Sequence, residues 1–184
     1  MKTNESGRSM IEMLGVLAII GVLSIGGISG YSKAMSVYRV NKTTDQLMQI
    51  AASTRALFAG HKKYTALTKN NKPNMALIKK AHLVPDDMIN GDNMENIYGG
   101  TVLLNKANKG DRTDKAFAVS FSFIPQSSCI ELATKEWGQG RTSGLYSIKI
   151  NDTEVLATDG PVTIGTAMTA CANSTNNTIV WTFY

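Results

Sequence analysis

An acidic residue stands at the head of a long apolar segment near the start of this chain. Glu12 precedes residues 13–32, a run of twenty residues without a charge. As a helix this run is about 30 Å long, which matches the hydrocarbon core of a bilayer. A carboxylate beside such a segment is unfavourable unless a cation or a proton neutralises it. The sequence therefore predicts a membrane-spanning helix in which Glu12 has a specific partner.

The residues around this run differ from those of a cleaved secretory signal. The run is long enough to span a membrane, and Gly30-Tyr31-Ser32-Lys33 follows it without the small-residue pattern of a signal cleavage site. A small residue instead precedes the run, at Gly7. If the chain is cut, the cut is expected before the apolar helix.

Residues 7–12, Gly-Arg-Ser-Met-Ile-Glu, resemble the class III signal of type IV prepilins. In that family a dedicated peptidase on the cytoplasmic side cuts after the glycine and leaves the helix on the mature protein. The resemblance implies cleavage between Gly7 and Arg8 and methylation of the new amino group of Arg8. The carboxylate of Glu12 would then neutralise the amino terminus of a neighbouring subunit in a filament. The alternative is that Glu12 only favours the positive end of the helix dipole, which is worth less than about 2 kcal/mol.

The predicted helix extends beyond the apolar run. No proline occurs before Pro73, and residues 8–59 would form a helix of about 78 Å. Its second half has one apolar face, made of Leu47, Ile50, Ala51, Thr54, Leu57 and Phe58, and an opposite polar face, made of Lys42, Asp45, Gln49 and Ser53. The first half is expected to contact lipid or sister helices, and the second half is expected to pack on the chain's own head.

The rest of the chain predicts an α+β head with an antiparallel sheet. Strand patterns cover residues 101–104, 117–123, 145–150 and 178–184, and a short helix capped by Asn74 covers residues 74–82. Four alternating residues, Phe117, Val119, Phe121 and Phe123, are expected on one buried face. Ser128 and Glu131 have the spacing of a capping box, which predicts a helix carrying Cys129.

The cysteines indicate where the head resides. Cys129 and Cys171 are the only two cysteines, and both follow the apolar run. This pair predicts one disulfide and an oxidising compartment, either periplasmic or extracellular. The expected organisation is a leader at 1–7, a transmembrane and assembly helix at 8–32, and a globular head at 33–184 that includes the amphipathic helix half at 33–60.

The head carries a second resemblance. Residues 83–88, Leu-Val-Pro-Asp-Asp-Met, and residues 96–102, Asn-Ile-Tyr-Gly-Gly-Thr-Val, are similar to the major pilins of the thin pili of conjugative plasmids, which are type IVb pilins. Pro125, Cys129 and residues 170–172 fit the same pattern. The resemblance implies a filament subunit for adhesion or contact between cells.

The sequence favours no catalytic, metal or nucleotide site, and we expect no cofactor. His61 and His82 lack the spacing of metal ligands or of a nucleophile and its base. Residues 86–92 are better interpreted as an acidic turn than as a calcium loop, and residues 138–144 as a flexible hairpin loop. This loop and residues 174–177 are the candidate contacts with the outside. The basic residues behind the net charge of +5 are scattered, which predicts no specific nucleic-acid binding.

The sequence therefore predicts a structural subunit of a type IV pilus. We expect prepilin peptidase to cut it while it is held in the bacterial inner membrane with a periplasmic head. Inner-membrane pilus assembly machinery would then extract it into an extracellular homo-oligomeric filament. A minor pilin or a type II secretion pseudopilin would share every N-terminal feature. A single-pass, membrane-anchored binding protein or enzyme is the alternative from another class.

Overall fold

The computed structural model describes residues 5–137 and 144–184. The chain divides into two compact units, Met1–Tyr38 and Arg39–Tyr184. One continuous helix, α1 (Glu5–Phe58), supplies nearly all of the first unit and the first element of the second. Its length of 54 residues agrees with the helix expected from the absence of early prolines.

The C-terminal half of α1 is amphipathic, as expected. Its buried stripe consists of Val40, Thr43, Gln46, Leu47, Ile50, Ala51, Thr54 and Phe58. Leu57 was expected on this stripe, but its side chain is 39% exposed. The stripe follows spacings of three and four residues, and Leu57 lies on its flank, beyond the width that the head covers.

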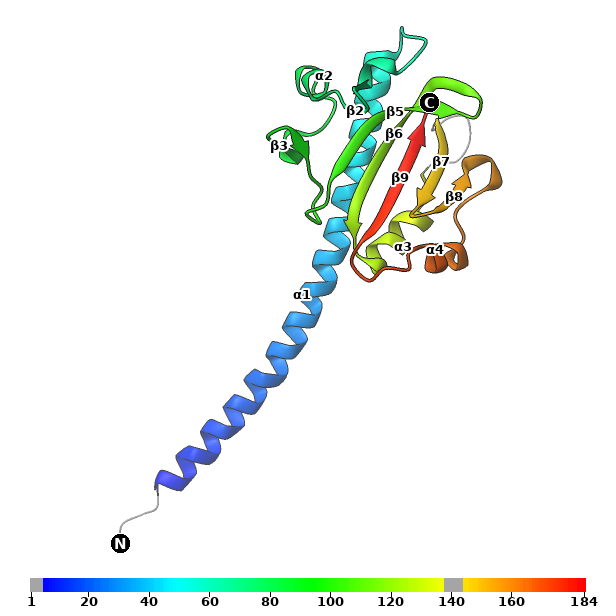
Figure 1. The fold of residues 1–184 in the computed structure, drawn as a ribbon. Helices are drawn as coiled ribbons and strands as arrows, with labels where there is room; N and C mark the ends of the chain where they lie inside the picture. Colours follow the sequence, from blue (N-terminus) through cyan, green and yellow to red (C-terminus); the bar gives the residue numbers. More distant parts are fainter. Residues whose placement is uncertain (1–4, 138–143) are drawn as a thin grey trace. The chain divides into compact units, whose positions relative to one another are not determined.

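The head contains a five-stranded antiparallel sheet, which confirms the expected α+β fold (Figure 1). The spatial order of its strands is β5-β6-β9-β7-β8. They comprise β5 (Val102–Lys109), β6 (Arg112–Ile124), β7 (Leu145–Ile150), β8 (Thr153–Leu156) and β9 (Asn177–Phe183). The last strand of the sequence is thus central, and Trp181 pairs with Val119 on one side and with Ile148 on the other.

Short elements connect α1 to β5. They are η1 (Thr65–Leu67), β1 (Thr68–Lys69), β2 (Lys72–Pro73), α2 (Met75–Lys80), η2 (Asp86–Met88), β3 (Ile89–Asn90) and β4 (Asn93–Met94). The predicted cap of α2 is present, because the side chain of Asn74 accepts a hydrogen bond from the backbone N–H of Leu77 at 3.4 Å.

Three further elements lie between the strands, namely α3 (Gln126–Thr134), η3 (Ala157–Asp159) and α4 (Ile164–Ala170). The predicted helix carrying Cys129 is α3, but the predicted capping box of Ser128 and Glu131 is wrong. The helix begins earlier, since the N–H of Cys129 already donates to the carbonyl of Pro125 at 2.8 Å. Ser128 therefore lies inside the first turn, where it is buried.

The core lies between α1 and one face of the sheet. Phe117, Val119 and Phe121 are fully buried there, as the alternation along β6 predicted. Phe123 is the exception: its side chain is 52% exposed, and Ile124 takes the buried place. Phe123 has a left-handed backbone with φ of 59°, and the pairing of β6 with β9 shifts between Phe121 and Ile124. This bulge reverses the alternation of side chains at the end of the strand.

Candidate functional site: the apolar helix and its supporting head

The N-terminal part of α1 presents apolar side chains on every side. Its large residues are between 53% and 73% exposed, namely Met10, Ile11, Met13, Leu14, Val16, Leu17, Ile19, Ile20, Val22, Leu23, Ile25 and Ile28. A continuous apolar surface of this extent marks a site of contact with lipid or protein. By length and composition α1 is also able to cross a membrane.

The residues expected to act in processing lie in the first turns of this helix. Gly7 and Arg8 belong to α1, and Glu12 follows four residues after Arg8. The Glu12 side chain is exposed, at the edge of the apolar surface. The helix thus brings the three positions together on one short segment.

The second half of α1 is fastened to the head by polar contacts as well as by the core. Lys42 forms an ion pair with Asp87 at 2.6 Å, and Gln46 donates to the same carboxylate at 3.4 Å. On another side, Lys135 after α3 donates to the hydroxyl of Thr44 at 3.1 Å. These contacts fix the head on the helix half that it covers.

The Tyr98-Gly99-Gly100 segment forms a tight turn that leads into β5. Asn96 organises this turn, because its side-chain oxygen accepts from the N–H of Tyr98 at 2.8 Å and of Gly100 at 3.1 Å. Gly99 has φ of 80°, which glycine adopts at little cost. A β-carbon at Gly100 would overlap the carbonyl oxygen of Ser122, so the close approach of the two backbones requires glycine. Burial raises the pKa of the Tyr98 phenol.

A disulfide and a buried amide network hold the segment that precedes β9. Cys129 on α3 is bonded to Cys171 at the end of α4, as predicted. Asn177 is fully buried, and its amide nitrogen donates to the carbonyls of Ile124 at 3.0 Å and Asn173 at 2.5 Å. Its oxygen accepts from the amide of Asn151 at 3.0 Å. The sequence analysis included Asn177 in the candidate contact segment 174–177, which is wrong for this residue, because nothing in the local pattern distinguishes it from the exposed asparagines beside it.

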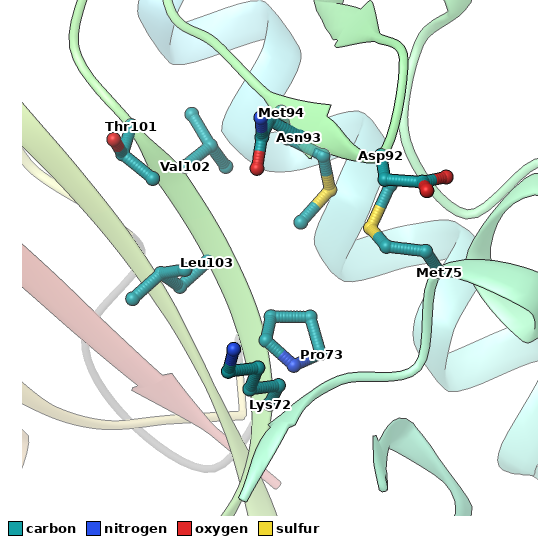
Figure 2. Close-up of a pocket in the computed structure, with 9 residues that line it drawn as sticks. All are labelled: Lys72, Pro73, Met75, Asp92, Asn93, Met94, Thr101, Val102 and Leu103. Carbon is teal, nitrogen blue, oxygen red and sulfur yellow. The ribbon is translucent and has the colours of Figure 1, made fainter.

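A groove lies beside the first residues of β5 (Figure 2). Its volume is about 610 Å³, and its lining consists of Lys72, Pro73, Met75, Asp92, Asn93, Met94, Thr101, Val102 and Leu103. Figure 2 shows the side chains of Met75 and Met94 turned into the space between α2, β4 and β5. Asp92 at the rim forms an ion pair with Lys79 at 2.9 Å. The lining combines methionine and proline with two charged side chains and holds no nucleophile with a neighbouring base.

The remaining candidate residues form no chemical site in the described part of the head. The ring of His61 contacts Phe58 edge-on, with 5.8 Å between the ring centroids. His82 faces Asp86 at 3.6 Å on the surface. Within residues 5–137 and 144–184, no group of three histidine, cysteine or acidic residues could hold a metal ion. Residues 86–92 form η2, β3 and the turn that leads to β4. Residues 138–143 of the predicted glycine-rich loop lie outside the described residues.

A family model described as PilS N terminal matches residues 37–184, which is most of the chain. This chain belongs to the PilS family of pilins. The family consists of structural subunits, so the chain is a structural subunit of a pilus and not an enzyme.

The fold of this PilS-family chain is similar to that of solved pilins. The crystal structure of a type IVb pilin from Salmonella typhi is 23% identical, with a TM-score of 0.54, and the match covers 78% of this chain and 96% of that one. TcpA, a type IV pilin from the Vibrio cholerae El Tor biotype, is 12% identical with a TM-score of 0.54, and the match covers 80% of this chain and 99% of that one. No curated protein matches this PilS-family chain in sequence. The two likenesses show that the long helix and sheet form a pilin fold.

Proposed function

We propose that this PilS-family protein is a type IVb major pilin. In this proposal, prepilin peptidase cuts between Gly7 and Arg8 at the inner membrane, and the new amino group of Arg8 is methylated. The head faces the periplasm until the assembly machinery inserts the subunit into an extracellular filament for adhesion or contact between cells. Membership of the PilS family and similarity to thin-pilus pilins along the Tyr98-Gly99-Gly100 segment support this assignment.

The apolar surface of α1 is the observation that carries the proposal. A lipid bilayer can cover it before assembly, and the helices of neighbouring subunits can cover it afterwards. A contact between different surfaces of identical subunits does not close on itself, so it builds a fibre. In this proposal the carboxylate of Glu12 pairs with a cation of the next subunit in the dry bundle and so gives the packing its register.

Mass spectrometry of the native mature amino terminus tests the processing step. We expect the chain to begin at Arg8 and to carry a methyl group on the amine. A native protein that still begins at Met1 would contradict the proposal. If the uncleaved protein were fully functional, the alternative of a membrane-anchored binding protein would be favoured.

Glu12→Ala tests the assembly step. We expect the variant to enter the membrane but to assemble poorly, because an unmatched amine is left between the helices. Each 1.4 kcal/mol of lost pairing weakens subunit addition about tenfold. Filament yield by electron microscopy and sedimentation is the measurement, with Asp45→Ala, an exposed carboxylate on the head half of α1, as the matched control. A normal yield of filaments from Glu12→Ala would count against the pairing.

The abundance of this chain in purified filaments tests its role as the major subunit. A major pilin supplies nearly all of the mass of the filament. If the chain were present only in trace amounts, or only in short filaments of a secretion system, it would be a minor pilin or a pseudopilin.

A further inference from the structure

The sequence Asn-x-Ser/Thr, the acceptor pattern for N-linked glycans, occurs several times in this chain. The acceptor positions are Asn4, Asn41, Asn151, Asn173 and Asn176. Asn4 lies in the expected leader and outside the described residues. A transferase has to reach the amide and the hydroxyl two residues later at the same time, so the structure can separate usable acceptors from unusable ones.

Asn41 and Asn151 are unsuitable acceptors in the folded head. Asn41 is exposed, but it lies within α1, and its hydroxyl partner Thr43 is fully buried and donates to the carbonyl of Arg39. The amide of Asn151 is engaged, since its nitrogen donates to Ala170 and its oxygen accepts from the backbone N–H of Thr178 at 2.9 Å.

Asn176 is also blocked. Its side chain is exposed, but the next residue is Asn177, which is fully buried in the amide network. The hydroxyl partner Thr178 belongs to β9, the central strand of the sheet. This acceptor segment could enter a transferase only if the start of β9 unfolded.

Asn173 meets every requirement. Asn173, Ser174 and Thr175 are all exposed and lie in an irregular connection between α4 and β9. Asn177 holds only the backbone of Asn173: the side-chain oxygen of Asn177 accepts from the Asn173 N–H at 3.1 Å, and its amide nitrogen donates to the Asn173 carbonyl at 2.5 Å. The side-chain amide of Asn173 makes no hydrogen bond with the described residues.

We propose that Asn173 is an acceptor site for an N-linked oligosaccharide on the exported head. The amide nitrogen of Asn173 attacks the anomeric carbon of a lipid pyrophosphate-linked oligosaccharide and forms a C–N bond. The bond from the anomeric carbon to the pyrophosphate oxygen breaks, the lipid pyrophosphate leaves as an anion, and the amide proton passes to a base of the transferase. The inference rests on the proposed exposure of the head outside the cytoplasm, and no oxidant is needed.

The test uses the purified full-length protein in detergent, its disulfide intact. It is incubated with an oligosaccharyltransferase that recognises Asn-x-Ser/Thr and with a lipid-linked oligosaccharide, and glycopeptides are located by mass spectrometry. Among the acceptor positions of the head, we expect the sugar on Asn173 and on none of Asn41, Asn151 and Asn176. It should be lost in Asn173→Gln and Thr175→Ala, retained in Thr175→Ser, and unchanged in the matched controls Asn41→Gln and Asn176→Gln.

Several results would overturn the inference. The accessibility argument fails if the unfolded, reduced chain is modified at Asn173 but the folded protein is not. The acceptor assignment fails if neither form is modified, or if the sugar is found on Asn151 or Asn176. It also fails if a sugar linked to the hydroxyl of Ser174 or Thr175 is still present in Asn173→Gln. Because the reaction needs no filament, its failure is distinguishable from failure of the proposed pilus function.

Discussion

Single residues decide how β5 and β6 meet at one end of the sheet. The Tyr-Gly-Gly motif is visible in the sequence, but its reason is the contact of Gly100 with the backbone of Ser122. Phe123, next to Ser122, occupies a left-handed conformation that is unfavourable for a bulky residue. The turn and the bulge thus form one unit, in which a small residue just before β5 accommodates an irregularity in β6.

Gly100→Ala is expected to destabilise the head by about 1–3 kcal/mol, the usual range for overpacking. The added methyl group would overlap the carbonyl oxygen of Ser122 and lie 2.9 Å from the β-carbon of Phe123, so the backbone would have to move. Thermal unfolding of the full-length protein in detergent, followed by circular dichroism, measures the effect. Gly60→Ala is the control, because a β-carbon there has open space. Equal melting temperatures for the two variants would contradict this account.

At the scale of elements, Asp114 connects the chain after α1 to the β5–β6 hairpin. Its carboxylate accepts from Lys106 Nζ and from the Thr65 hydroxyl, each at 3.1 Å, and its carbonyl accepts from the N–H of Tyr64 at 2.9 Å. Burial alone would raise the pKa of Asp114, but the hydrogen bonds from Lys106 and Thr65 outweigh burial and hold the pKa below its ordinary value.

Asp114→Asn is expected to lower stability at neutral pH and to matter less in acid. Because the folded-state pKa lies below the unfolded one, Asp114 contributes stability above the unfolded pKa of about 3.9. This contribution disappears as the pH falls through the folded-state value. Melting temperatures measured from pH 7 to pH 2 should therefore converge for wild type and variant. Asp111→Asn, an exposed acid in the same hairpin, is the control, and a constant difference across the pH range would contradict the linkage.

At the scale of the whole molecule, two stretches of α1 have different surroundings. Residues 39–58 complete the core of the head, whereas the large residues from Met10 to Ile28 have an exposed apolar surface. The head is closed by Cys129–Cys171, which are separated by 42 residues. This bridge links α3 to the end of α4. The next regular element in the chain is the central strand β9.

Cys129→Ser is expected to cost about 4 kcal/mol of head stability, the chain-entropy estimate for a loop of this length. Denaturant unfolding under oxidising conditions is the measurement. The double replacement of Cys129 and Cys171 by serine should match the single one, since either breaks the same bridge. An unchanged unfolding midpoint, or equal midpoints for wild type with and without reductant, would show that the bridge contributes nothing.

Much of this fold could be predicted because its signals are local. The uninterrupted helix, the alternation in β7 and β9, and the pairing of two cysteines each follow from residues read in order. The missed features have weak or overlooked local signals, or a non-local cause. β8 and α4 carry weak patterns, the exposure of Phe123 depends on a bulge relative to β9, and the early start of α3 depends on Pro125.

The sequence by itself determined that this protein has a long helix with an apolar first half, one acid at its head and a disulfide-bearing α+β domain. Periodicity, charge and the single pair of cysteines suffice for these conclusions, since they describe single elements, their solvent and the compartment of the head. Only the tertiary structure decided that the last strand is central, that Gly100 cannot carry a side chain, and that Asn177 is buried while Asn173 is exposed. Those properties arise from contacts between segments far apart in the chain, which no local pattern records.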